Sequence, residues 1–281
     1  MTGCSDNQDR GARIVDVVIV AHNAGELLSA SVASAVEQAG CNAVWVIDAE
    51  SADGSVQALA AEQPGVHVLA VPNAGFSAGN NRGIERTSAP YVLLLNPDAE
   101  LLPDALATLI GVAEAHPNAA IVGPAILNPD GTAQANSFGR FPTVASAVEL
   151  RLARLANRLA GNAKQSPRLP GMTKSVDWVT GAAMLVRRSA VRDVGAMDEG
   201  FFLYYEDFEW CHRMRDRGWD VLLEPSAFVV HHMGAAGADS ERVEQAYRDS
   251  FYRYCDLYGL WGLKSVSRIS LALRSAFGGR G

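Results

Sequence analysis

The chain has 281 residues, of which 48% are hydrophobic and 20% are charged, and its formal net charge is −7. Such a chain can bury one large core or two modest ones, which excludes a disordered or fibrous protein and favours an α/β enzyme. The four cysteines are scattered without a CxxC pair, so we expect reduced thiols in a cytoplasmic protein rather than disulfides. No apolar run reaches membrane-spanning length and the polar first residues contain no apolar leader, so we expect a soluble or peripheral protein.

The positive charges gather in two segments. Residues 145–168 and residues 260–281 each carry an excess of four positive charges, although the whole chain is acidic. An acidic body with two basic, amphipathic segments predicts no nucleic-acid partner and a contact with an anionic membrane surface. The alternative for each segment is a helix whose charged face is simply solvated.

The first half of the chain alternates short apolar runs with helical stretches. Strands are predicted at 17–20, 44–47, 66–71 and 91–95, and helices at 27–38, 54–62, 78–86 and 103–115. Continuous apolar strands joined by helices predict a mostly parallel central sheet with helices on both faces. Ligands of such sheets bind outside the carboxyl ends of the strands. This rule places His22, Asn23, Asp48 and Asp98 on one rim.

The second half is less regular. Residues 140–170 predict a basic helix and a proline-containing loop, which form either an insertion or the start of an acceptor-binding half. A strand interrupted by Gly181 is predicted at 176–186, followed by helices at 206–217, 240–257 and 260–277. The last helix is amphipathic and either lies on a membrane surface or packs on the rest of the chain or a second copy.

An acidic cluster lies in the segment 204–210, where Glu206, Asp207 and Glu209 stand among aromatic residues. Burial and neighbouring like charges raise the pKa of a carboxylate, so such a cluster is costly unless it binds a metal or handles protons. Asp98 follows a buried strand upstream, and the pair His231-His232 follows one downstream. This order predicts a metal-assisted group transfer.

Two further motifs each have a functional and a structural interpretation. Asp48 ends a strand, where its carboxylate can accept a hydrogen bond from the N3–H of uracil or thymine, or can serve the turn alone. The glycine-rich segment 73–84 begins a helix whose amides can approach a diphosphate, with Asn80 and Asn81 beside them. The same glycines can instead pack that helix closely on the sheet.

Four segments occur in the order seen in family 2 glycosyltransferases and are most similar to the rhamnosyltransferase-like branch. They are residues 48–55, 75–83, 95–98 and 200–207, and the similarity covers about residues 15–260. The resemblance implies a GT-A fold, which is a Rossmann-like α/β architecture, together with a nucleoside-diphosphate sugar donor, a divalent cation and inversion at the anomeric carbon. A hard cation such as Mg²⁺ or Mn²⁺ neutralises the leaving diphosphate, and a carboxylate takes the proton of the acceptor hydroxyl.

The resemblance also assigns roles to residues by position. Asp207 looks like the catalytic base, with Glu206 beside it to raise its pKa. Asp98 looks like the metal-binding residue that ends the DxD-type motif of the family. His232 looks like the late metal-binding histidine, because a small-residue loop follows it in the chain. His231 is then expected to point to the other side of its strand and to be structural.

Two residues depart from the family pattern. Asn96 stands at the first DxD position, which is expected to weaken metal binding. Ala49 stands where an asparagine is common, which removes one side-chain contact. Trp178 offers a stacking face to a sugar or belongs to the core. The nucleotide-sugar contacts predicted along the chain are His22, Asn23, Asp48, Ser51, Gly75, Phe76, Gly79, Asn80, Asn81, Asn96, Asp177, Trp178 and Gly181.

The implied activity is transfer of rhamnose or a similar sugar from a dTDP- or UDP-linked donor. The implied acceptor is a cell-surface glycan or a polyprenyl-diphosphate-linked sugar at the cytoplasmic face of the plasma membrane. The alternative is a non-catalytic sugar-nucleotide or glycan-binding module on the same fold. A dehydrogenase is disfavoured because residues 21–25, after the first strand, contain no GxGxxG.

The chain is expected to divide into four parts. Residues 1–14 form a disordered tail, residues 15–125 a nucleotide-sugar-binding half, and residues 126–239 an acceptor-binding and catalytic half with the basic helical insertion. Residues 240–281 form C-terminal amphipathic helices, which also offer a surface for a homo-oligomer.

Overall fold

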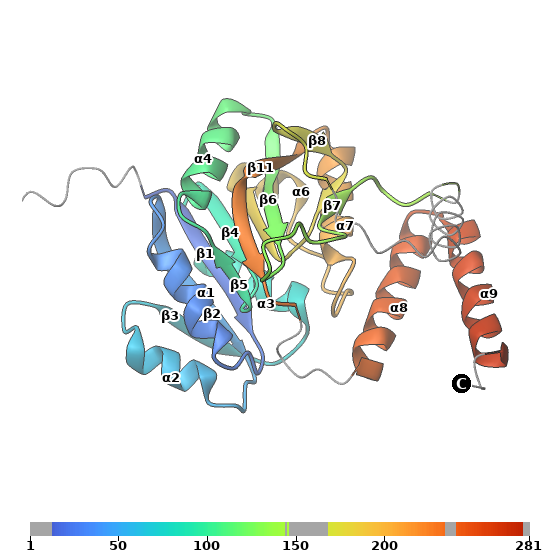
Figure 1. The fold of residues 1–281 in the computed structure, drawn as a ribbon, viewed down its shortest axis with the longest axis horizontal. Coiled ribbons are helices and arrows are strands. Elements are labelled where there is room, and N and C mark those ends of the chain that lie inside the picture. Colours follow the sequence, from blue (N-terminus) through green and yellow to red (C-terminus); the bar gives the residue numbers. More distant parts are fainter. Residues whose placement is uncertain (1–12, 144, 146–167, 234–239, 278–281) are drawn as a thin grey trace, which may run out of the picture.

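The computed structural model describes residues 13–143, 145, 168–233 and 240–277. They form a mixed α/β fold in which a nine-stranded, mostly parallel sheet has the order β3-β2-β1-β4-β10-β6-β11-β5, with β8 paired to β11 (Figure 1). The predicted basic helix within 140–170, most of the N-terminal tail and the small-residue loop after Met233 lie outside the described residues.

The strands divide into a parallel group and a mixed group. β1 (Val15–Ala21), β2 (Cys41–Ala49), β3 (His67–Val71) and β4 (Tyr91–Leu95) are parallel neighbours. β10 (Ala183–Arg187) runs antiparallel between β4 and β6 (Ala119–Leu127), and β11 (Asp220–His231) is parallel to β6. Two short strands, β5 (Ala99–Leu101) and β8 (Lys174–Val176), pair antiparallel with β11. A separate ribbon pairs β7 (Phe138–Gly139) with β9 (Trp178–Val179).

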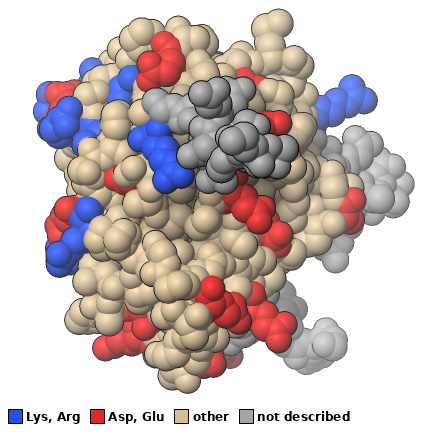
Figure 2. Space-filling model, turned by 90° about the vertical axis from the view of Figure 1, so that its left-hand side faces the viewer, with Lys and Arg blue, Asp and Glu red and all other residues tan. Residues whose placement is uncertain are grey.

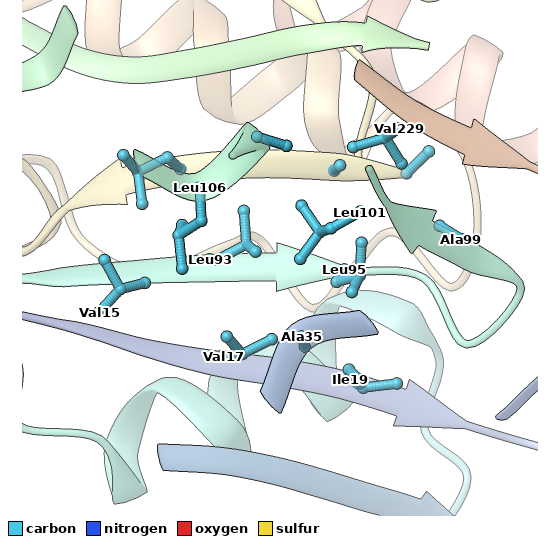
Figure 3. Close-up of a cluster of buried hydrophobic side chains, with 14 of the residues drawn as sticks. Val15, Val17, Ile19, Ala35, Leu93, Leu95, Ala99, Leu101, Leu106 and Val229 are labelled. Atoms are coloured by element: carbon cyan, nitrogen blue, oxygen red, sulfur yellow. The ribbon is translucent and has the colours of Figure 1, made fainter. Parts of the chain in front are cut away.

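Helices cover both faces of the sheet because the buried strands are apolar on both sides. In β1, Val17 and Ile19 join one buried cluster, shown in Figure 3, while Val18 joins the other. The first cluster packs on α1 (Leu27–Val36), α2 (Ser55–Glu62) and α4 (Ala105–Ala115). The second packs on α3 (Phe76–Arg86), α6 (Arg188–Val194) and α7 (Glu206–Asp216).

Two C-terminal helices, α8 (Ser240–Leu257) and α9 (Trp261–Phe277), stand beside this core (Figure 1). Within the described residues, no helix combines the length and the apolar character needed to cross a bilayer. On the face shown in Figure 2, which lies at 90° to the view of Figure 1, acidic side chains are spread widely, and basic ones lie in its upper part and along its left edge.

The expected α/β architecture is confirmed, and the differences lie in the second half. The single strand expected at 176–186 is divided among β8, β9 and β10, because the amides of Asp177 and Thr180 bond to the carbonyls of Gly139 and Ser137 instead of continuing the main sheet. β5, β6 and α6 are additional elements. The expected boundary at residue 125 falls inside β6, so both halves share one sheet.

The position of β10 brings distant segments to one rim of the sheet. Because Ala183 pairs with Leu95 across the antiparallel ladder, the chain just before β10 lies beside the chain just after β4. The amide of Asn96 accordingly donates to the carbonyl of Ala182 at 2.9 Å. The end of β11 reaches the same rim, since His231 pairs with Ala99.

The glycines of α3 allow that helix to lie close against β1, and Gly83 tests this constraint. A Cβ at Gly83 would lie 2.2 Å from Cγ1 of Val18, so Gly83→Ala should lower the free energy of unfolding by roughly 1–3 kcal/mol, as overpacking does. Gly111 of α4 is the matched control, because a Cβ there meets no atom within 4 Å. Gly111→Ala should be neutral or stabilising by up to about 1 kcal/mol. Equal stability of the two variants in urea denaturation would contradict close packing of α3.

Candidate active site

The tips of β1 and β2 are joined by a network of hydrogen bonds. Asp48 Oδ1 accepts from the Ser51 amide at 2.9 Å, and Asn23 Oδ1 accepts from the Ala52 amide at 2.8 Å. His22 Nδ1 lies 2.7 Å from the carbonyl of Ala49, which therefore accepts its proton. Asp48 thus supports its own turn, and it also lines an open pocket of about 270 Å³ formed with Glu50, Ala70, Val71 and Pro72. Both interpretations of Asp48 are compatible with this geometry.

The glycine-rich start of α3 is held against the loop that precedes α7. Gly75 has φ +102°, and a Cβ on it would lie 2.4 Å from the carbonyl oxygen of Phe202. The Phe76 amide donates to that same oxygen at 2.7 Å, and Ser77 Oγ donates to the carbonyl of Phe201 at 2.9 Å. Gly79 lies against Val20 of β1. This segment therefore packs helix, strand and loop together.

The two asparagines of α3 are also bonded within the protein. Asn81 exchanges two hydrogen bonds with the backbone of Met197, at 2.9 and 3.0 Å, and donates to Glu199 at 3.0 Å. Asn80 is buried and donates to the carbonyl of Phe76 at 3.0 Å. Asn81 thus holds the loop that follows α6, Asn80 bonds within α3, and their role as nucleotide contacts stays a prediction.

Asp177 and Trp178 lie in the packing between β9 and α7. Asp177 accepts from the Phe141 amide at 2.9 Å and pairs with Arg140 at 3.2 Å. The Trp178 ring is buried and stacks on Phe208 with 4.0 Å between the ring centroids. Trp178 is therefore a buried residue with one face of its ring covered by Phe208, and its role as a sugar contact stays a prediction.

Asp207 lies in the first turn of α7 and is held by two backbone amides. Its Oδ2 accepts from the Gly181 amide at 2.9 Å and its Oδ1 accepts from the Phe208 amide at 2.8 Å. Burial raises the pKa of Asp207 above its usual value, and these hydrogen bonds to the charged form oppose that rise. Asp207 is thus a fixed carboxylate beside the chain that leads into β10.

Glu206 differs from its neighbour in both environment and partners. Its side chain is buried, and its Oε2 has no hydrogen-bond partner among the described residues. Burial raises the pKa of Glu206 well above its usual range, and the charge of Asp207 raises it further. Burial therefore favours the protonated form of Glu206, and each of the two neighbouring carboxylates disfavours ionisation of the other.

An aromatic cluster supports the loop before α7. Tyr204 and Tyr205 both have left-handed backbone angles, with φ values of 68° and 66°, which non-glycine residues adopt only when their surroundings impose it. The Tyr205 hydroxyl lies 3.1 Å from that of Tyr247 in α8, and its ring also contacts Phe251 and Tyr254. α8 is therefore part of the site's framework, although no motif in the sequence indicates this contact.

Tyr204, next to Tyr205 in this loop, is partly exposed. Its side chain is 38% exposed and meets the Tyr247 ring edge-on at 5.6 Å. Burial raises the pKa of the Tyr204 hydroxyl, and the charge of Asp98 raises it further. Tyr204 is thus close enough to Asp98 to interact with it electrostatically. The sequence alone did not indicate this interaction.

A second polar group forms where β4 ends and β11 ends. His231 Nε2 lies 3.2 Å from Asp98 Oδ1 and 3.2 Å from Asn96 Nδ2. His232 instead has its Nε2 2.8 Å from Glu100. The side chain expected to meet Asp98 was that of His232, whereas the structure places His231 there. Adjacent strand residues point to opposite faces, and the β5–β11 register decides which histidine faces Asp98.

The donor set at this point fits a hard divalent cation. Within the described part of the chain, no three His, Cys, Asp or Glu side chains form a metal cluster. The group does contain the Asp98 carboxylate, the His231 imidazole and the Asn96 amide, whose buried Oδ1 has no hydrogen-bond partner among the described residues. A cation that takes most of its ligands from phosphate and water needs no more than such a partial set.

Comparisons with known proteins identify the family and the fold. Residues 16–195 match the family described as "Glycosyl transferase family 2". The N-acetylglucosaminyl-diphospho-decaprenol L-rhamnosyltransferase of Mycobacterium tuberculosis is 30% identical over 93% of this chain and 92% of its own length. The rhamnosyltransferase WbbL of Escherichia coli K12 is 27% identical over 56% of this chain and 61% of its own.

Two solved structures share the fold. GalNAc-T7 with UDP, GalNAc and Mn²⁺ superimposes with a TM-score of 0.61 at 16% identity, over 88% of this chain and 48% of its own. The mannosyltransferase PcManGT from Pyrobaculum calidifontis with GDP-Man and Mn²⁺ gives 0.59 at 17% identity, over 88% of this chain and 66% of its own. These two likenesses support the GT-A architecture, and the sequence matches support the family. The chain therefore belongs to glycosyltransferase family 2, as a rhamnosyltransferase-like member.

Proposed function

We propose that this enzyme transfers rhamnose or a similar sugar from a dTDP- or UDP-linked donor to a polyprenyl-linked or other cell-surface glycan acceptor, with inversion at the anomeric carbon. The observation that carries the proposal is the rim of the sheet, where the fixed carboxylate of Asp207 and the group of Asn96, Asp98 and His231 come together around β10. The mycobacterial relative is named as a rhamnosyltransferase with a decaprenol-linked acceptor. This name supports the choice of sugar and acceptor.

The two carboxylates of α7 suit a single displacement. Asp207 can take the proton of the acceptor hydroxyl, since its pKa is raised yet its ionised form accepts two amide hydrogen bonds. Glu206 favours its protonated form and is buried, so it is a poor second nucleophile. A single displacement that uses one base and forms no covalent intermediate inverts the configuration at the anomeric carbon.

The other side of the rim suits the leaving group. Asp98 and His231, with Asn96, would hold a divalent cation such as Mg²⁺ or Mn²⁺, which would neutralise charge on the departing nucleoside diphosphate. At the far end, Asp48 lines the pocket in which a pyrimidine base would present its N3–H. The bound Mn²⁺ in both solved structures of the same fold supports this arrangement.

Replacing the proposed base tests the mechanism. Asp207→Asn keeps the shape and removes the proton acceptor, so kcat should fall by about 10²–10⁴-fold while the Kd of the donor nucleotide changes little. Glu206→Gln is the matched control, because the protonated form of Glu206 is already favoured, and it should retain most of the turnover.

The pH dependence gives an independent readout of the same assignment. Because Asp207 must be ionised and its pKa is raised by burial, kcat/KM should fall as the pH drops through that raised value, and the fall should be lost in Asp207→Asn. If Asp207→Asn keeps wild-type turnover and Glu206→Gln abolishes it, the roles of the two residues are reversed.

Metal dependence tests the second group. Asp98→Ala and His231→Ala should each raise the Mn²⁺ concentration needed for half-maximal activity by about tenfold or more, because each removes a ligand. His232→Ala is the control, since the His232 imidazole pairs with Glu100. Full activity in excess chelator would show that no cation is needed, and a selective loss in His232→Ala would restore the assignment made from the sequence.

The C-terminal hairpin bears on the acceptor. Trp261 is 70% exposed and Ile269 is 61% exposed, which gives α9 apolar side chains that the rest of the described chain does not cover. Lys264 pairs with Asp256, and Arg268 lies 5.2 Å from the centre of the Tyr252 ring, so part of the positive charge is used within the hairpin. Apolar burial would therefore contribute more to membrane contact than charge does.

Vesicle sedimentation tests this contact. We expect the full chain to bind vesicles containing anionic lipid and to lose that binding on truncation after Gly259, whereas Trp261→Ala should weaken it partially. Arg268→Gln is the control, because Arg268 is engaged by Tyr252, and it should reduce binding less than Trp261→Ala. No binding to either neutral or anionic vesicles would leave α9 as a packing or oligomerisation element.

A further inference from the structure

Gln134 is a buried polar residue next to the proposed cation site, and no motif or family assignment gives it a role. It follows β6, where its backbone amide donates to the carbonyl of Ile126 at 2.8 Å. Its side chain is 6% exposed, and its Oε1 lies 2.9 Å from Nδ1 of His231. Gln134 therefore contacts Nδ1 of the imidazole, whereas Asp98 and Asn96 lie beside Nε2.

The orientation of the Gln134 amide follows from its other partners. Its Nε2 lies 3.2 Å from the carbonyl oxygen of His231 and 3.2 Å from Asn128 Oδ1. A backbone carbonyl can only accept, so the NH₂ end of Gln134 must face it. The Oε1 end then faces the His231 ring and can only accept a proton from Nδ1.

A chain of hydrogen bonds on the surface turn supports the same direction. Asp130 Oδ1 accepts from Thr132 Oγ1 at 2.6 Å, so the Thr132 hydroxyl accepts in turn from Asn128 Nδ2 at 2.9 Å. This places Asn128 Oδ1 toward Gln134 Nε2. Because an ionised carboxylate has no proton to give, the chain from Asp130 to Gln134 has one consistent direction.

The consequence for His231 is a single tautomer. When Nδ1 carries the proton, Nε2 of the neutral ring carries the lone pair, and this nitrogen is the one 3.2 Å from Asp98 Oδ1. The Asn96 amide N–H can donate to that lone pair. A ring protonated on both nitrogens instead donates from Nε2 to Asp98, and a bound cation takes the place of that proton. Neighbouring ligand atoms around a small divalent cation are about 3 Å apart, which matches the observed separation.

We propose that Gln134 is a positioning residue that keeps His231 protonated on Nδ1 and directs the Nε2 lone pair toward a divalent cation shared with Asp98. This inference rests on the cation of the proposed function. Histidines that bind metals in proteins commonly donate their second N–H to such a partner, and loss of that partner weakens metal affinity by roughly 10–100-fold.

Nitrogen NMR of the metal-free protein tests the tautomer without any substitution in Gln134. Long-range ¹H–¹⁵N spectra of ¹⁵N-histidine-labelled protein at neutral pH should show His231 protonated on Nδ1, with its signals assigned by their loss in His231→Asn. An Nδ1 that carries no proton, or a rapid mixture of both neutral tautomers, would overturn the proposal.

Binding of Mn²⁺ alone, followed by the EPR signal of the free ion, tests the role of Gln134. Gln134→Met has similar length and lacks both hydrogen bonds, so the Kd for Mn²⁺ should rise by roughly 10–100-fold. Gln134→Glu retains an acceptor for Nδ1 and should bind Mn²⁺ within a few-fold of the wild type. Thr132→Val changes the turn and leaves Gln134 in place, so it controls for loss of turn stability.

The outcomes separate this inference from the proposed function. Wild-type binding of Mn²⁺ that is unchanged in Gln134→Met would overturn only the positioning role. Absence of Mn²⁺ binding by the wild type would overturn the cation assignment and, with it, the role of Gln134. Equal weakening in Gln134→Met and Gln134→Glu would also contradict the proposal, because a role in packing alone predicts no rescue by an acceptor.

Discussion

The antiparallel placement of β10 between β4 and β6 is the constraint on which the site depends. It joins the parallel first half to the second half in one sheet. It also reverses the chain direction, so the segment entering β10 lies at the rim where β4 ends. Gly181 in that segment provides the amide that holds Asp207, while Asn96, just after β4, approaches His231. The proposed base and the proposed cation site are neighbours for this reason.

The loop between α6 and α7 is held from two sides, which accounts for the left-handed pair before α7. On one side Asn81 and the close approach of Gly75 secure residues 197–202. On the other, Ser250 of α8 donates to the carbonyl of Leu203 at 2.8 Å. These contacts offset the backbone strain at Tyr204 and Tyr205. This left-handed pair directly precedes α7 and sets where the helix begins. The buried charge of Asp207 is then offset by amide hydrogen bonds whose positions the surrounding packing has already fixed.

The sequence predicted the parts of the site that depend on local pattern. Apolar runs located the parallel strands, and the rule for their carboxyl ends located Asp48 and Asp98 on the rim. The contact of Asp98 with His231 instead of His232 depends on the register of β5 against β11, a non-local pairing that no spacing reveals. Trp178 and Tyr247 show the same limit. Each is an aromatic residue in an ordinary pattern, yet one stacks in the core on Phe208 and the other supports Tyr205 from a distant helix.

A crystal structure with Mn²⁺ and dTDP or UDP tests the arrangement of the rim most directly. We predict an anomalous Mn²⁺ peak within about 2.0–2.3 Å of the Asp98 carboxylate and of His231 Nε2, in contact with the diphosphate, and the base in the pocket beside Asp48. A peak coordinated by His232 and Glu100, or a diphosphate bound away from Asp98, would contradict it.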